Sequence, residues 1–165
     1  METTLLRAPV FYGEYDRDID PKNRIFVPAE IRNAFDPERD GQGFFMTIGI
    51  NGVPWFHGAK FYEQWALRLP PALTPTEEQL EYDQANFALA CPIPWDKQGR
   101  IVIPDRTLKR TRTEKLVTLV GVRDHLELWN RAAWAAQRDR LEQRRPVIAI
   151  RAQQITQAAA TTSNP

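Results

Sequence analysis

A nine-residue pattern that occurs twice constrains the fold of this chain more than any other feature. The two copies span residues 20–28 and 96–104, and each reads Asp, three turn-forming or basic residues, Arg, three apolar residues and Pro. The spacing from Asp to Arg to Pro is the same in both copies, which are offset by 76 residues (96 − 20). A pattern repeated at a fixed offset is typical of an internal duplication, so we expect one structural unit built twice.

Each copy predicts a strand, a turn, a second strand and the start of a helix. Asn23 and Gly99 occupy matching turn positions, where a positive φ is tolerated best. The three apolar residues after each Arg have high β propensity and predict a short strand. Pro28 and Pro104 suit a first helical position followed by acidic residues, so a short helix should follow each strand.

Both turns carry the same kinds of charged residue, so they are the candidate binding sites. The residues are Asp20, Lys22 and Arg24 in the first turn and Asp96, Lys97 and Arg100 in the second. In a structural interpretation each Asp–Arg pair is an exposed ion pair that holds its turn and contributes about 0–1 kcal/mol. In a functional interpretation the carboxylate orients the guanidinium toward a phosphate or a guanine edge. Spacing alone favours the structural interpretation, and the lysines are either solvated or phosphate contacts.

The segments around the two motifs resemble the MraZ family over residues 11–135. The resemblance rests on the paired motifs, on Phe11-Tyr12-Gly13-Glu14-Tyr15 before the first, and on Leu119-Val120-Gly121-Val122 and Leu126-Glu127-Leu128-Trp129 after the second. Members of this family are bacterial transcriptional regulators with two tandem AbrB-type swapped-hairpin modules. The resemblance implies a ring-shaped homo-oligomer that binds double-stranded DNA at repeated promoter sites ahead of division and cell-wall genes. It also favours the functional interpretation of the Asp–Arg pairs.

Two parts of the first half depart from the family pattern. Pro21 and Asn23 stand where the first family motif usually has a freer residue and Gly, and residues 50–59 look unfamiliar, with Trp55 in no recognisable role. DNA contact can therefore rest on both modules or on the second alone, through Arg100.

The expected fold is α+β, with two tandem swapped-hairpin modules that form a pseudo-two-fold β core with peripheral helices. A module of roughly 45 residues buries too little apolar surface to be stable alone, so two modules should interlock. We expect a first module at 9–56, a helical linker at 57–90, a second module at 91–134, and a C-terminal helix with a flexible tail at 135–165.

Capping and breaker residues predict where the helices begin and end. A capping box at Thr74-Pro75-Thr76-Glu77 should open the second linker helix. Asn130 should cap the C-terminal helix and Pro146 should end it, with residues 147–150 as an edge strand or more helix. The run from Gln157 lacks an apolar period, which is typical of a disordered tail.

Composition excludes several other classes of protein. With a formal net charge of +1, DNA binding must come from local clusters of Lys and Arg, such as the one within residues 109–115. The single cysteine, Cys91, excludes an internal disulfide. His57 and His125 lack a metal-ligand spacing and no glycine-rich phosphate loop is present, so we expect no enzyme activity, metal, cofactor or small-molecule substrate. No run has the length and apolarity of a membrane span, so we expect a cytoplasmic, nucleoid-associated protein.

A different function on the same fold stays open. An antitoxin-like or other protein-binding module could use the same hairpins without regulating DNA, because a fold does not determine a function.

Overall fold

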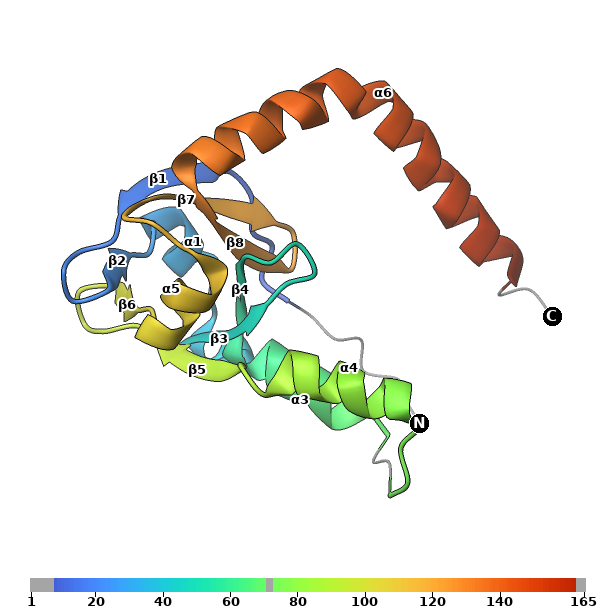
Figure 1. The fold of residues 1–165 in the computed structure, drawn as a ribbon, viewed down its shortest axis with the longest axis horizontal. Helices are drawn as coiled ribbons and strands as arrows, with labels where there is room; N and C mark the ends of the chain where they lie inside the picture. Colours follow the sequence, from blue (N-terminus) through green and yellow to red (C-terminus); the bar gives the residue numbers. More distant parts are fainter. Residues whose placement is uncertain (1–7, 71–72, 163–165) are drawn as a thin grey trace. The chain divides into compact units, whose positions relative to one another are not determined.

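The structure is a computed structural model that describes residues 8–70 and 73–162 (Figure 1). The chain divides into two units, Met1–Arg131 and Ala132–Pro165, and each is described by itself.

The first unit contains eight strands and five helices among its described residues. In chain order they are β1 (Glu14–Asp18), β2 (Arg24–Phe26), α1 (Ala29–Asn33), α2 (Pro37–Asp40), β3 (Gly43–Ile48), β4 (Pro54–Gly58), α3 (Ala59–Arg68), α4 (Glu77–Phe87), β5 (Cys91–Pro94), β6 (Arg100–Val102), α5 (Asp105–Thr111), β7 (Leu116–Val122) and β8 (His125–Asn130). Helix α6 (Arg131–Thr162) starts at the last residue of this unit and forms the second unit.

Strands from the two halves of the sequence interleave within two antiparallel sheets. The larger sheet has six strands in the order β1-β7-β8-β4-β3-β5, and β2 pairs with β6 in a separate ribbon. Exchanging each strand for its counterpart, β1 for β5, β3 for β7 and β4 for β8, gives the same order in reverse. The prediction of an α+β fold is therefore confirmed, and the two halves share one sheet.

The core is built by apolar side chains from both halves. Ile25 and Ile101 are direct partners on β2 and β6, and each is 1% exposed. Phe44 on β3 is buried between Phe35 of the first half and Trp95 of the second, with ring centroids 5.3 Å and 5.4 Å away. Because neither half supplies all of these partners, the core forms only when the two halves are together.

Both motif prolines precede their helices by one residue. Pro28 (φ −53°, ψ 143°) and Pro104 (φ −58°, ψ 135°) are extended N-cap residues, so the prediction of a first helical position is wrong. The fixed φ of proline fits a helix and an extended conformation equally, and ψ decides between them. The cap of α4 is likewise Thr76, whose side chain accepts from the Gln79 N–H at 3.2 Å, rather than Thr74.

The C-terminal helix continues past both of its predicted stops. Helix α6 runs through Pro146 and residues 147–150 to Thr162, so the predicted end at Pro146 is wrong. The disorder expected from Gln157 onward is also wrong for the residues up to Thr162. Residues 163–165 lie outside the described residues. Proline removes one backbone donor and bends a helix without having to end it, and Figure 1 shows α6 bent near its middle.

Asn130, the last residue of β8, binds the loop between α5 and β7 with both atoms of its side-chain amide. Its Oδ1 accepts from the Glu114 N–H at 2.7 Å, and its Nδ2 donates to the Arg112 carbonyl at 2.9 Å. The side chain therefore ties the end of β8 to the loop that follows α5.

Within the described residues, no helix has both the length and the apolar character needed to span a membrane.

Candidate nucleic-acid interface

The first motif turn is organised by the carboxylate of Asp20. Its Oδ1 accepts from the backbone N–H groups of Lys22 at 2.8 Å and Arg24 at 2.9 Å. Its Oδ2 accepts from the Arg24 Nε at 2.6 Å. One oxygen therefore builds the turn, while the other fixes the direction of the guanidinium.

The second motif turn repeats these hydrogen bonds, and Arg100 Nη2 adds a contact with Asp96 Oδ2 at 2.8 Å. Asp96 Oδ1 accepts from the backbone N–H groups of Gln98 at 2.8 Å and Arg100 at 3.0 Å, and Oδ2 accepts from the Arg100 Nε at 2.8 Å. The structural and functional interpretations of the Asp–Arg pair are thus compatible, because the two roles use different oxygens.

These hydrogen bonds keep both carboxylates ionised. The backbone N–H of Arg24, together with its guanidinium, holds the pKa of Asp20 below its ordinary value of 3.8. The backbone N–H and then the guanidinium of Arg100 do the same for the pKa of Asp96. The carboxylates therefore accept hydrogen bonds throughout the neutral range, and lose that role only when the pH falls below their ordinary pKa values.

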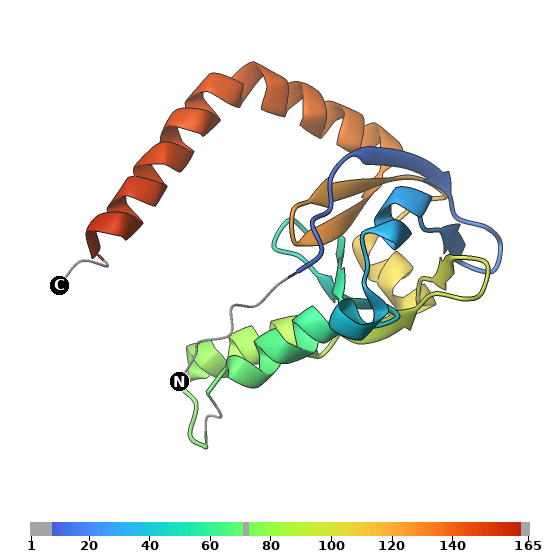
Figure 2. The same cartoon turned by 180° about the vertical axis from the view of Figure 1, so that it is seen from behind.

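The two turns are held to each other by reciprocal backbone hydrogen bonds. Val27 N–H donates to the Gly99 carbonyl at 2.9 Å, and Ile103 N–H donates to the Asn23 carbonyl at 2.8 Å. Asn23 (φ 58°) and Gly99 (φ 76°) have the positive φ predicted for these positions. Each turn is thus fastened to the strand of the other half, and Figures 1 and 2 show both turns beside the β2–β6 ribbon.

Both arginines lie on the outer face of this ribbon. Arg24 is paired with Val102 and Phe26 with Arg100, while the buried Ile25–Ile101 pair takes the inner face. The Cζ of Arg100 lies 5.9 Å from the centroid of the Phe26 ring. Phe26 and Val102 are 55% and 54% exposed, so they belong to this surface, and strand alternation counted from the arginines is the signal that identifies them.

A third arginine joins the second turn but not the first. Arg32 on α1 donates from Nε to the Val27 carbonyl at 3.3 Å. Its guanidinium lies over Gly99, where an added Cβ would come within 2.7 Å of Arg32 Cζ. The residue 76 positions later is Leu108. Sequence reasoning missed Arg32 because its contact crosses from one half to the other.

Leu108 instead lines a hollow of about 300 Å³ beside the first turn. Asp20, Asn23 and Lys115 also line this hollow. The first turn therefore has an apolar side chain where the second has a cation, so the two turns present different surroundings to a ligand.

The remaining basic candidates are exposed around the turns. Lys22 and Lys97 lie at the tips of their turns. Lys109, in the basic cluster after the second motif, forms an ion pair with Asp105 at 2.7 Å. Lys22 and Lys97 can reach a phosphate, whereas the charge of Lys109 is partly neutralised by Asp105 within α5.

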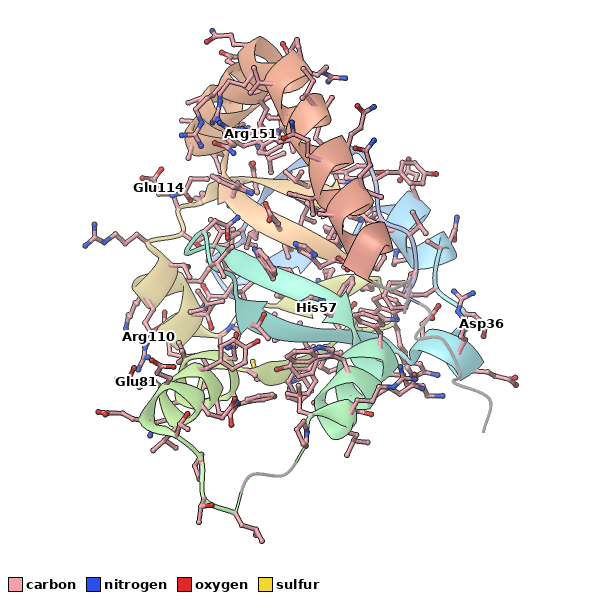
Figure 3. All side chains as sticks on the ribbon, turned by 90° about the vertical axis from the view of Figure 1, so that its right-hand side faces the viewer. Asp36, His57, Glu81, Arg110, Glu114 and Arg151 are labelled. Atoms are coloured by element: carbon pink, nitrogen blue, oxygen red, sulfur yellow. The ribbon has the colours of Figure 1, made fainter. Side chains whose placement is uncertain are left out.

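Trp55 and the two histidines form a separate cluster on β4 and β8. Trp55 Nε1 donates to Asn51 Oδ1 at 2.9 Å, and its ring stacks on His125 with centroids 4.0 Å apart. His57, labelled in Figure 3, is the cross-strand partner of His125. Burial, and then the nearby His125, lowers the pKa of His57 to about 4. Among the described residues, no group of three His, Cys, Asp or Glu is placed to hold a metal.

Comparison with known proteins matches this chain to one family. A family model described as "MraZ protein, putative antitoxin-like" matches residues 87–157, which include the second turn. The protein named transcriptional regulator MraZ from Clostridium beijerinckii is 30% identical over 129 residues, which cover 76% of this chain and 85% of that relative. Its namesake from Mycoplasmopsis pulmonis is 28% identical over 131 residues, covering 79% of this chain and 86% of the relative. Both relatives are named as regulators of transcription and not as enzymes.

The two oxygens of Asp96 predict different effects for different substitutions. Asp96→Ala should lower the thermal unfolding temperature by a few degrees, because two backbone N–H groups of the turn lose their acceptor. Asp96→Asn keeps an oxygen for those donors, and Arg100→Ala removes only surface contacts, namely the ion pair and the stacking on Phe26, so both should unfold close to the parent. Equal destabilisation by all three variants, measured by circular dichroism melts, would contradict this division of roles.

The low pKa of His57 predicts a loss of stability in acid. The unfolded chain protonates this histidine near pH 6.5 and the folded chain only near pH 4, so stability should fall between these values. The slope from this one group is at most about 1.4 kcal/mol per pH unit. Urea unfolding of His57→Phe should show a flatter decline over this range than the parent chain. An unchanged slope would mean that His57 is not held neutral by the fold.

Proposed function

The chain belongs to the MraZ family, and from that premise we propose that it is a sequence-specific DNA-binding regulator of transcription. The DNA-binding surface in this proposal is the outer face of the β2–β6 ribbon with its two turns. One observation carries the proposal: two Asp–Arg pairs with the same hydrogen bonds lie at the two turns of this one ribbon.

The dimensions of the ribbon suit the major groove. A two-stranded β-ribbon fits a groove about 12 Å wide, and three residues per strand extend for roughly 10 Å. Arg24 binds its own carboxylate through Nε, and Arg100 binds its own through Nε and one N–H of Nη2, so the remaining terminal N–H groups stay available for the two acceptors on a guanine edge. Lys22 and Lys97 would then contact phosphates on either side.

Local charge, and not net charge, would attract the DNA. The chain has a formal net charge of +1, whereas the surroundings of the two turns contain Arg24, Arg32, Arg100 and the two turn lysines. Because Asp20 and Asp96 offset part of this charge, affinity should depend on a small number of phosphate contacts. In this role the protein would be cytoplasmic and would associate with the nucleoid.

The finer family features extend this proposal. The interleaving of strands from the two halves supports two interlocked swapped-hairpin modules. Exposed apolar side chains on and around α3 and α4, among them Leu67, Leu80 and Tyr82, support contacts between subunits of a ring. Such a ring would bind repeated promoter sites ahead of division and cell-wall genes, with linked weak contacts reinforcing one another.

A protein-binding function is the second candidate. The antitoxin-like description of the family model and the apolar Phe26 and Val102 on the ribbon favour it. In that case the ribbon would bind a protein surface, and no duplex would be selected from a random pool.

The test starts from duplexes that the full-length chain selects from random DNA. Arg24→Gln and Arg100→Gln should each weaken binding by about tenfold to a hundredfold, the usual value of a lost bidentate contact, and should make the salt dependence shallower. Thermal unfolding should be unchanged.

Arg123→Gln is the matched control. Its side chain is 85% exposed, and the residue directly follows Val122 at one end of β7. The other end of β7, Leu116, pairs with Asp18 shortly before the first turn, so Arg123 lies at the end of β7 away from that turn. It removes the same charge and should leave affinity unchanged. Equal loss of binding in all three variants would show that only general charge matters, and no loss in either turn variant would refute the proposed surface.

A further inference from the structure

The outer face of the ribbon combines each arginine with one exposed apolar side chain. Arg24 lies directly opposite Val102, and Arg100 lies directly opposite Phe26. Phe26 and Val102 are themselves counterparts in the duplication (26 + 76 = 102). Both halves therefore place an apolar residue at the same position of the interface.

The fold gives these two side chains little reason to be apolar. Ile25 and Ile101, each 1% exposed, are the ribbon residues that pack against the core. Phe26 and Val102 keep more than half of their surface in water. Stacking with Arg100 at 5.9 Å gives Phe26 a partial role, but among the described residues no arginine stacks on Val102 in the same way. A shared ligand explains both positions.

We propose that Phe26 and Val102 read the C5-methyl groups of thymines in the major groove. This inference rests on the proposed function, because it assigns a second kind of base contact to the same surface. The thymine methyl is the apolar feature of the major-groove edge, and apolar side chains recognise it by contact. When the methyl group replaces water against Phe26 or Val102, apolar surface is removed from solvent on both the DNA and the protein.

Cross-strand spacing restricts where such thymines lie. Directly opposite residues in an antiparallel pair have Cβ atoms about 5 Å apart, and successive base pairs are separated by about 3.4 Å. A thymine read by Val102 should therefore be within one or two base pairs of a guanine read by Arg24. The same relation should hold for Phe26 and Arg100, with the larger effect at Phe26 because its ring covers more surface.

The test removes one methyl group at a time from a duplex selected by the full-length protein. Each thymine is replaced by deoxyuridine, which keeps base pairing and every hydrogen-bonding group. At one or more thymines close to an arginine-dependent guanine, the parent chain should bind the deoxyuridine duplex about fourfold more weakly, the value expected for one methyl group. Phe26→Ala or Val102→Ser should bind the thymine duplex more weakly and lose the difference between thymine and deoxyuridine at its own position.

Phe26→Leu is the control, because it keeps an apolar side chain and should keep the discrimination. Thermal unfolding and molar mass by light scattering check that the variants fold and assemble as the parent does. The inference is overturned if no thymine shows discrimination, or if both variants keep it. It is also overturned if the variants change only the molar mass, which would make these side chains subunit contacts. If Arg24→Gln and Arg100→Gln still weaken binding in that case, the proposed function stands without this inference.

Discussion

The proposed DNA-binding surface depends on the two reciprocal hydrogen bonds that join each turn to the strand of the other half. Val27 donates to Gly99 and Ile103 donates to Asn23, and the buried Ile25–Ile101 pair lies between them. One such bond contributes only about 0.5–1.5 kcal/mol net, so the bonds matter mainly for geometry. They set the register that puts both arginines on one face, and neither half can form that register alone.

Duplication gave the two turns one framework, and later divergence gave them different surroundings. Gly99 has no side chain, which leaves room for the Arg32 guanidinium above the second turn. At the first turn the equivalent neighbour is Leu108, beside a hollow that Asn23 also lines. A ligand therefore meets two similar guanidinium groups in unequal electrostatic settings, which suits a DNA site whose two parts differ in sequence.

Local features of this chain could be predicted from sequence, whereas contacts between the halves could not. The positive φ of Asn23 and Gly99 and the pairing of each Asp with its Arg depend on residues within a single turn. The contact of Arg32 with the second turn depends on which elements of the two halves lie side by side, and no short-range pattern encodes that partner. Pro146 misled for a related reason, since a proline shows where a helix loses a hydrogen bond but not whether the helix resumes.

Methylation interference with dimethyl sulfate tests most directly whether the β2–β6 ribbon enters the major groove, as we propose. This reagent modifies guanine N7 in the major groove and adenine N3 in the minor groove, so a single experiment compares the two grooves of a selected duplex. The structure predicts that methylation of specific guanines at N7 prevents binding, while methylation of adenines at N3 has no effect. Interference at adenine N3 with none at guanine N7 would contradict the account.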